Sequence, residues 1–255
     1  MNLPLIDTNI VFDIVFDIVY GGRYRHKIAI EFYKQFKNYE LSIEKNVYTE
    51  CSDVLYKYSS DFSMDFKNFL DSNSKFWNKM DKHDRSEIID IFLKNMDNKR
   101  GVDYIPFYHG IIDKVEDDLI YFRKEDLIDF IFNLPSKMVK YLCESIESRF
   151  STVFPDSYAE DTDIINDGNI NELYNMFINN YFNPRQSYDA LILTSLIDII
   201  NYGNKIDGIN FYTCDGTFVK NFKKISSNKP SIQNMELKKY FLNGIENITF
   251  KKPYS

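Results

Sequence analysis

Four acidic residues that lie far apart in the sequence occupy positions from which they could act together. Asp7 and Asp215 each follow shortly after an apolar run that is typical of a buried strand. Glu50 and Asp189 fall near the starts of segments with helical periodicity. In a parallel α/β sheet, ligands bind outside the carboxyl ends of the strands. We therefore expect the four carboxylates to reach one crevice.

Carboxylates gathered in this way need a partner of opposite charge. Two like charges about 4 Å apart repel each other by roughly 4 kcal/mol at an effective dielectric constant near 20. Either some of the acids bind protons, or divalent cations neutralise them. Oxygen ligands without Cys or His favour Mg²⁺ or Mn²⁺ over zinc. Two such ions about 4 Å apart can activate a water and stabilise both oxygens of an in-line phosphodiester displacement.

Four segments, in chain order, resemble the PIN-domain nucleases: LPLIDTNIV (3–11), IEKNVYTECSDVL (43–55), SYDALILTSLI (187–197) and FYTCDGTFVKNF (211–222). The resemblance implies a Rossmann-like parallel sheet flanked by helices. It also implies phosphodiester hydrolysis, usually of RNA, by a metal-activated water with Mg²⁺ or Mn²⁺. The family's catalytic and metal-binding acids fall on Asp7, Glu50, Asp189 and Asp215. Supporting polar roles fall on Asn9 and Thr213.

The resemblance covers the two ends of the chain, and the same ends show strand–helix alternation. We expect a PIN-like α/β core formed by residues 1–58 and 184–255. Its strands are expected at residues 3–6, 39–43, 208–213 and 245–250. Its helices are expected at residues 10–20, 26–36, 46–58, 187–202 and 216–222.

Residues 59–183 have no counterpart in that resemblance and are expected to form an inserted, mainly helical subdomain. Helical patches occur at residues 63–76, 86–96, 125–132 and 136–150, and an acidic, polar connection occupies residues 152–170. The insertion could cap the site and restrict its substrates, or it could bind a protein partner or a second copy of the chain.

The charge of the chain is unevenly distributed. The net charge is −7, but residues 220–255 carry eight lysines and two glutamates, or +6, which leaves −13 for the rest. A basic segment of this kind can meet a nucleic-acid backbone. More often, such a segment is simply a solvated, lysine-rich surface.

Cysteine and histidine are scarce, which argues against a zinc site or a disulfide framework. The three cysteines form no CxxC pair, and the three histidines form no HxxxH motif. The most apolar stretch, residues 10–20, contains Asp13 and Asp17 and is too short and too charged to span a membrane. We therefore expect a cytoplasmic protein without a membrane partner.

Many of these residues also fit simpler structural roles. Any single acid could lie on the surface, Asp215 could be a helix N-cap, and Asp189 could favour a helix N-terminus through its charge. Trp77 and its basic neighbours could stack on bases, although aromatic residues in such helices more often face the core. His26, His83 and His109 are weak candidates for a general base, and Cys214 lies close to the expected site without a histidine neighbour in sequence.

Two other classes of function compete with a nuclease. A phosphatase of the haloacid-dehalogenase type also places an aspartate after its first strand, but it needs a second aspartate where this chain has Asn9. A non-catalytic PIN-like module could keep the fold and act only as a partner within a complex. Binding of Mn²⁺ would distinguish the metal-dependent enzyme from such a module.

Overall fold

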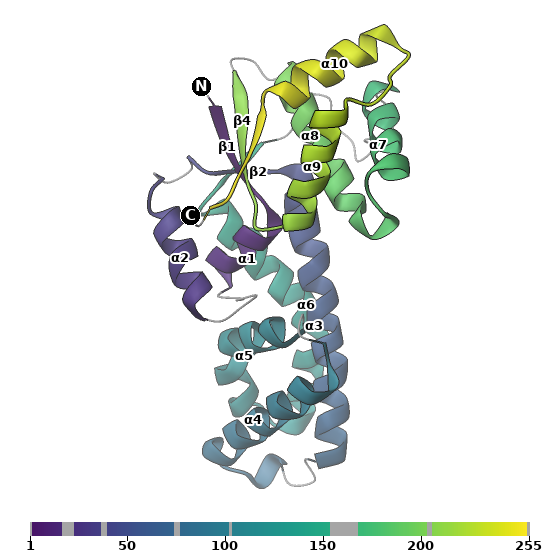
Figure 1. The fold of residues 1–255 in the computed structure, drawn as a ribbon. Helices are drawn as coiled ribbons and strands as arrows, with labels where there is room; N and C mark the ends of the chain where they lie inside the picture. The colour runs from purple at the N-terminus through teal and green to yellow at the C-terminus, as the bar shows by residue number, and fades with distance from the viewer. Residues whose placement is uncertain are drawn as a thin grey trace. The chain divides into compact units, whose positions relative to one another are not determined.

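The computed structural model describes residues 2–16, 23–36, 40–73, 77–101, 104–153, 168–202 and 206–253 (Figure 1). The chain divides into two compact units. The sheet unit comprises Met1–Val11, Ile28–Glu50 and Glu147–Ser255. The helical unit comprises Phe12–Lys27 and Cys51–Ile146.

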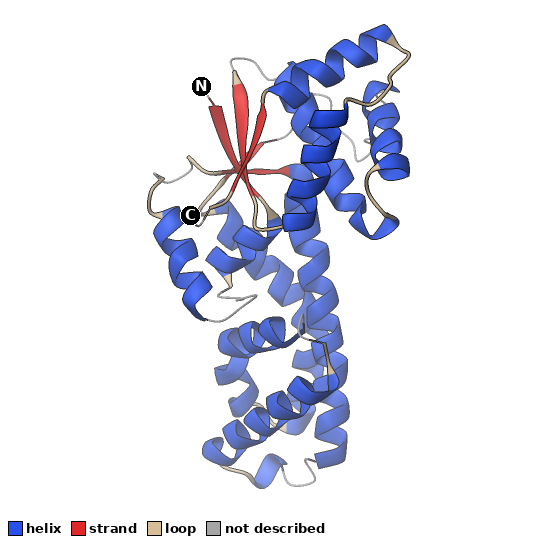
Figure 2. Cartoon of the chain, in the orientation of Figure 1, coloured by secondary structure: helices blue, strands red, loops and turns tan. Residues whose placement is uncertain are grey.

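The described strands of the sheet unit form one all-parallel, five-stranded sheet in the order β3-β2-β1-β4-β5 (Figure 2). They are β1 (Asn2–Ile6), β2 (Ser42–Glu44), β3 (Ser151–Val153), β4 (Gly208–Tyr212) and β5 (Ile248–Lys251). The central strand β1 pairs with β4 along its whole length. This confirms the expected α/β class with a parallel sheet, and the arrangement is consistent with a Rossmann-like fold.

The strand order reverses at the centre of this sheet. From β1 the chain adds β2 and β3 on one side, and it then returns to add β4 and β5 on the other. Such a reversal is a topological switch point, and the crevice at the carboxyl ends of the two strands is where ligands bind in open α/β sheets. In this chain the switch point lies between β1 and β4, and Asp7 and Asp215 follow these two strands.

Helices α7 (Gly168–Asn180), α8 (Ser187–Tyr202), α9 (Gly216–Asn228) and α10 (Met235–Glu246) belong to the sheet unit, and a 3-10 turn (Pro184–Gln186) precedes α8. Helix α8 contacts β2 and β4, and α7 and α10 pack against α8 (Figure 1). Gly244 permits close contact between α10 and α8, because a Cβ at this position would lie 2.5 Å from Cγ2 of Ile197. On α9, Phe218 packs its ring against Phe211 of β4 and Phe250 of β5.

The described part of the helical unit has an aromatic core. Its helices are α4 (Lys82–Lys99), α5 (Tyr104–Tyr121), α6 (Lys124–Glu147) and the part of α3 (Lys45–Asn73) after Glu50. Phe62 and Phe66 of α3 contact Phe92 of α4, and Tyr108 of α5 meets Phe62 edge to face. Like α3, helices α1 (Thr8–Val15) and α2 (Arg23–Tyr33) have residues in both units.

Two long helices, α3 and α6, continue where the sequence predicts an interruption. Pro135, inside α6, has no N–H to donate to the carbonyl of Ile131 four residues earlier. The hydroxyl of Ser63 on α3 donates to that carbonyl instead, at 2.9 Å. Ser59 and Ser63 also donate to the carbonyls of Leu55 and Ser59 within α3. Helix α6 therefore joins the patch expected at 125–132 to most of the one expected at 136–150, and α3 joins the patch at 46–58 to the described part, residues 63–73, of the patch expected at 63–76.

The observed elements agree with the expected ones most closely at the two ends of the chain. Helix α8 has the expected bounds, and β1 and β4 match the expected strands within one residue. Helices α5 and α10 were not expected, and α9 extends beyond residue 222. Strand β3 and helix α7 fall within residues 59–183 but belong to the sheet unit.

Three of the expectations involve residues outside the described part of the chain. These are the end of the first helix with Asp17, the beginning of the second strand, and most of the acidic connection. Among the described residues, no helix is long and apolar enough to cross a membrane.

Candidate functional site

Asp7 stands at the carboxyl end of β1 and is held by several donors. Its backbone N–H donates to the carbonyl of Tyr212 on the neighbouring strand β4, at 3.0 Å. Its carboxylate accepts from the backbone N–H of Thr8 at 2.8 Å, from Nδ2 of Asn9 at 2.7 Å and from the hydroxyl of Thr213 at 2.5 Å. The side chain is buried, with 5% of its surface exposed. Sheet pairing and hydrogen bonds thus fix this carboxylate at the switch point.

Asp215 follows β4 and begins helix α9. One carboxylate oxygen accepts from the backbone N–H groups of Thr217 at 2.6 Å and Phe218 at 2.9 Å, so Asp215 is the N-cap of α9. Its own N–H donates to the hydroxyl of Thr213 at 2.9 Å. Thr213 therefore links Asp7 and Asp215 directly. The expected helix-cap role of Asp215 is confirmed, and it leaves the second carboxylate oxygen for other contacts.

Glu50 and Asp189 reach the same site from two helices. Glu50 lies in the second turn of α3 and accepts a hydrogen bond from the hydroxyl of Thr8. Asp189 lies in the first turn of α8 and accepts from Nε2 of Gln186 at 3.2 Å. Both side chains are half-buried. Because Thr8 also donates its N–H to Asp7, it connects Glu50 to the carboxylate at the end of β1.

The four carboxylates interact electrostatically with one another. Burial and, secondarily, the charge of Asp215 raise the pKa of Asp7 to about 6. Burial, and then the charges of Asp7, Asp189 and Asp215, raise the pKa of Glu50 to about 8. Burial, and then the charges of Asp215 and Asp7, raise the pKa of Asp189 to about 7. Every one of the six possible pairs among the four acids repels.

The two expected supporting residues both contact the acids. Asn9 donates to Asp7, and its Oδ1 accepts from the backbone N–H of Cys214 at 3.2 Å. Thr213 is buried and donates to Asp7. The structure therefore connects both supporting residues expected from the sequence to Asp7. Asn9 and Thr213 join the segment after β1 to the segment after β4.

One buried acid near this site could not be singled out from the sequence. Glu44, at the end of β2, is fully buried and accepts from the backbone N–H groups of Asn46 at 2.8 Å and Val47 at 3.3 Å. It also accepts from the hydroxyl of Ser195 on α8 at 2.6 Å. Burial raises the pKa of Glu44 to about 7. Glu44 thus ties the start of α3, which carries Glu50, to α8, which carries Asp189.

The sequence contains only a weak signal for that role of Glu44. An acid just before an expected helix is a common helix N-cap pattern. Ser195, however, is 151 residues away, and only the folded sheet unit brings the two residues together.

The other candidates from the sequence are Trp77, the histidines and the cysteines, and those whose side chains the structure describes form no part of the cluster of four carboxylates. Trp77 is buried and donates its Nε1–H to the carbonyl of Phe122 at 3.1 Å, so it belongs to the core of the helical unit. His83 and His109 are paired with Glu87 and Asp97 on exposed surfaces of that unit. The side chain of His26 lies outside the described residues. Cys51 is buried, and Cys214 is half-buried next to Asp215.

The acids suit a hard divalent cation in donor type and charge, but each of them accepts at least one hydrogen bond from a protein donor. Among the described residues, no three Asp, Glu, His or Cys side chains already converge as a ligand set. Thr8 holds Glu50, and Gln186 holds Asp189. Both donors belong to side chains that can rotate away. A cation at this site would replace these hydrogen bonds and relieve the repulsion among the four acids.

Comparisons with models of protein families, with curated proteins and with solved structures find no match to this chain. The function is therefore inferred from the carboxylates and their surroundings.

Proposed function

We propose that this chain is a PIN-like, Mg²⁺- or Mn²⁺-dependent nuclease that hydrolyses phosphodiester bonds in RNA. The observation that supports this most strongly is the mutual repulsion of Asp7, Glu50, Asp189 and Asp215 at the switch point of a parallel sheet. Repulsion among the four acids helps to raise the pKa values of Asp7, Glu50 and Asp189 and destabilises the ionised site. Bound divalent cations would offset this repulsion. They would also supply the positive charge that attracts an anionic substrate such as a phosphodiester.

Asp7, Glu50, Asp189 and Asp215 would hold the ions. When bound, the ions would neutralise the acids and make a water more acidic near neutral pH. The chain itself positions the acids: Asn9 and Thr213 fix the carboxylate of Asp7, and the N-cap contacts fix that of Asp215. The negative site repels phosphate until cations are present, so substrate binding at the acids would follow metal binding.

The hydrogen bonds of Asp7 weigh against the phosphatase alternative. A phosphatase of the haloacid-dehalogenase type would use the first aspartate as a nucleophile and an acid two positions later as a proton donor. Here that position is Asn9, which donates Nδ2 to Asp7 and cannot exchange a proton near neutral pH. The same Asp7 oxygen also accepts from Thr213, which leaves little freedom for attack on a phosphoryl group.

Cleavage of labelled RNA and DNA, single- and double-stranded, in Mn²⁺ and in chelator tests the proposal. We expect cleavage of RNA in Mn²⁺ alone, and we expect Asp7→Asn and Asp215→Asn to lose more than roughly 100-fold in rate, beyond the usual cost of changing an outer-shell partner. Asparagine is also a good N-cap, so Asp215→Asn keeps α9. Asp53→Asn, on the exposed face of α3, is the matched control. Cleavage at the wild-type rate by either active-site variant would refute the assignment.

The non-catalytic module predicts a different outcome in the same assay. A chain that acts only as a partner within a complex would leave every nucleic acid intact in Mn²⁺ and in chelator. Circular dichroism of each variant distinguishes lost activity from lost fold.

A further inference from the structure

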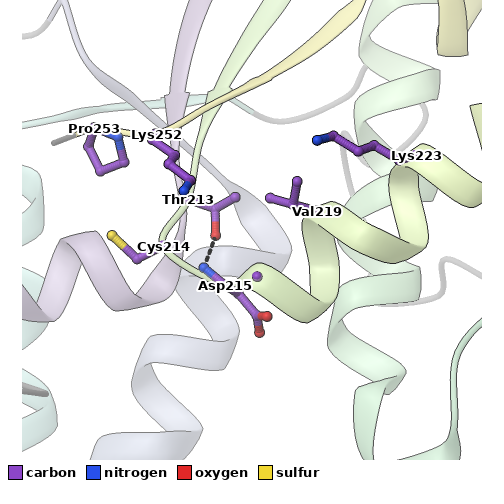
Figure 3. A pocket seen from close by; sticks show the side chains of 8 residues that line it. Thr213, Cys214, Asp215, Val219, Lys223, Lys252 and Pro253 are labelled. Atoms are coloured by element: carbon purple, nitrogen blue, oxygen red, sulfur yellow. Dashed lines mark hydrogen bonds between the residues drawn. The ribbon is translucent and has the colours of Figure 1, made fainter. Parts of the chain in front are cut away.

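A pocket adjoins the candidate site and shares Thr213 and Asp215 with it. Its volume is about 380 Å³. It is formed by residues 213–216, by Val219 and Lys223 of α9, and by Lys252 and Pro253 after β5 (Figure 3). Its size is in the range of small-ligand pockets.

Two lysines from different elements give this pocket its charge. The side chains of Lys223 and Lys252 are exposed and extend toward the same hollow (Figure 3). In the part of the chain that the structure describes, neither ammonium group forms an ion pair, whereas Lys229 in the same basic segment pairs with Glu246 at 2.7 Å. Both ammonium groups are therefore available to an anionic ligand.

The neighbouring acid does not cancel this charge. The carboxylate of Asp215 points away from both lysines and caps α9 through Thr217 and Phe218 (Figure 3). Asp215 therefore lines the pocket, while its carboxylate faces away from Lys223 and Lys252. Val219 and Pro253 add apolar surface to the pocket.

We infer that Lys223 and Lys252 bind a backbone phosphate of the polynucleotide, next to the phosphate that is cleaved. This inference rests on the proposed nuclease function and assigns part of its substrate path. Lysine ammonium groups bind phosphate as point charges. Because the acids repel the strand, a basic pocket next to Asp215 holds the backbone in place. The apolar surface of Val219 and Pro253 can pack against a sugar or a base.

Binding of a fluorescently labelled single-stranded RNA of about 20 nucleotides, followed by anisotropy in chelator over a range of salt concentrations, tests this inference. The double variant Lys223→Gln/Lys252→Gln is compared with Lys238→Gln/Lys239→Gln, which removes the same charge from the exposed surface of α10. We expect the first variant alone to weaken binding by at least about tenfold. Its plot of log affinity against log salt concentration should also be less steep, by about 0.7 in slope for each phosphate that the protein no longer neutralises.

Three results would overturn the inference, and one of them would indicate a small phosphate ligand instead. It fails if the pocket variant binds RNA as the wild type does, or if the α10 variant weakens binding equally. Competition by inorganic phosphate or a mononucleotide at the concentration at which the unlabelled oligonucleotide competes would overturn the polynucleotide assignment in favour of a small phosphate ligand.

The cleavage assay separates this inference from the proposed function. If the pocket variant cleaves RNA in Mn²⁺ with the wild-type KM, the pocket assignment is wrong and the nuclease stands. If the wild type binds RNA through the two lysines but cuts no nucleic acid in Mn²⁺, the nuclease is wrong and the pocket stands.

Discussion

Thr213 illustrates how a neutral residue can control a cluster of acids. Its hydroxyl donates to Asp7 and accepts from the backbone N–H of Asp215, so one side chain sets the spacing of two proposed ligands. It is buried, and therefore these hydrogen bonds do not compete with water. In the proposed site Thr213 acts through the acids and is a positioning residue.

Replacing Thr213 by valine keeps the shape of the side chain and removes both hydrogen bonds. We expect Thr213→Val to weaken Mn²⁺ binding by about 10- to 100-fold, as is usual when the partner of a metal ligand is removed. Thr249→Val, on the exposed side of β5, is the matched control. Mn²⁺ affinity, measured by calorimetry, should fall only in the first variant. Equal affinities in both variants would show that Thr213 has no part in positioning the ligands.

At the scale of elements, Gly244 determines how closely α10 packs on α8. A Cβ at residue 244 would lie 2.9 Å from the Cα of Ile197, a backbone atom that cannot rotate away. We expect Gly244→Ala to lower the free energy of unfolding by about 1–3 kcal/mol, the usual cost of overpacking. Gly216→Ala, where nothing lies within 4 Å, is the control. Urea denaturation measures both, and equal stabilities would contradict the close packing.

Elements could be predicted from the sequence where local signals and tertiary structure agree. Asp7 and Asp215 could be placed because each follows an apolar strand, and α8 because its apolar stripe is continuous. Helix α5 was not predicted, and Gly110 lowers the helical propensity of its interior, although Pro106 lies in its first turn, where proline is tolerated. Only the packing of its buried residues, such as Phe107 and Ile111, stabilises it as a helix.

Parts of the site were missed because they depend on tertiary structure alone. Thr8 and Gln186 are short-range neighbours of the acids, but their hydrogen bonds to Glu50 and Asp189 depend on side-chain positions that no spacing encodes. The division of the chain was also hard to anticipate. Strand β3 has only three residues, too few to show an alternating pattern, although it completes one edge of the sheet.

For the whole molecule, the raised pKa values of buried acids predict how stability depends on pH. The folded-state pKa values of Asp7, Glu44, Asp189 and Glu50 are about 6, 7, 7 and 8, above the ordinary values of 3.8 and 4.5. At pH values between the ordinary pKa and the raised folded-state pKa of each acid, the folded chain binds more protons than the unfolded chain. Stability therefore decreases as pH rises through this range. Each unit of difference corresponds to about 1.4 kcal/mol.

We therefore expect the Tm in chelator to fall between about pH 4.5 and pH 8. Glu50→Gln should make that fall smaller, because glutamine stays neutral throughout. Millimolar Mn²⁺ at about pH 8.5 should restore stability, since ions that bind only the folded chain shift the equilibrium toward it. Thermal unfolding followed by circular dichroism measures all three conditions. A Tm that rises with pH in chelator would contradict the assigned burial and repulsion.

The central claim is that four carboxylates at the switch point form one divalent-cation site. Titration of Mn²⁺ into the protein at about pH 7.5, with free Mn²⁺ followed by electron paramagnetic resonance, tests it most directly. We expect the wild type and Asp53→Asn to bind about two ions per chain below millimolar concentration, and Asp7→Asn to bind them much more weakly. Binding by Asp7→Asn equal to that of the wild type, or no binding by the wild type at millimolar Mn²⁺, would contradict the claim.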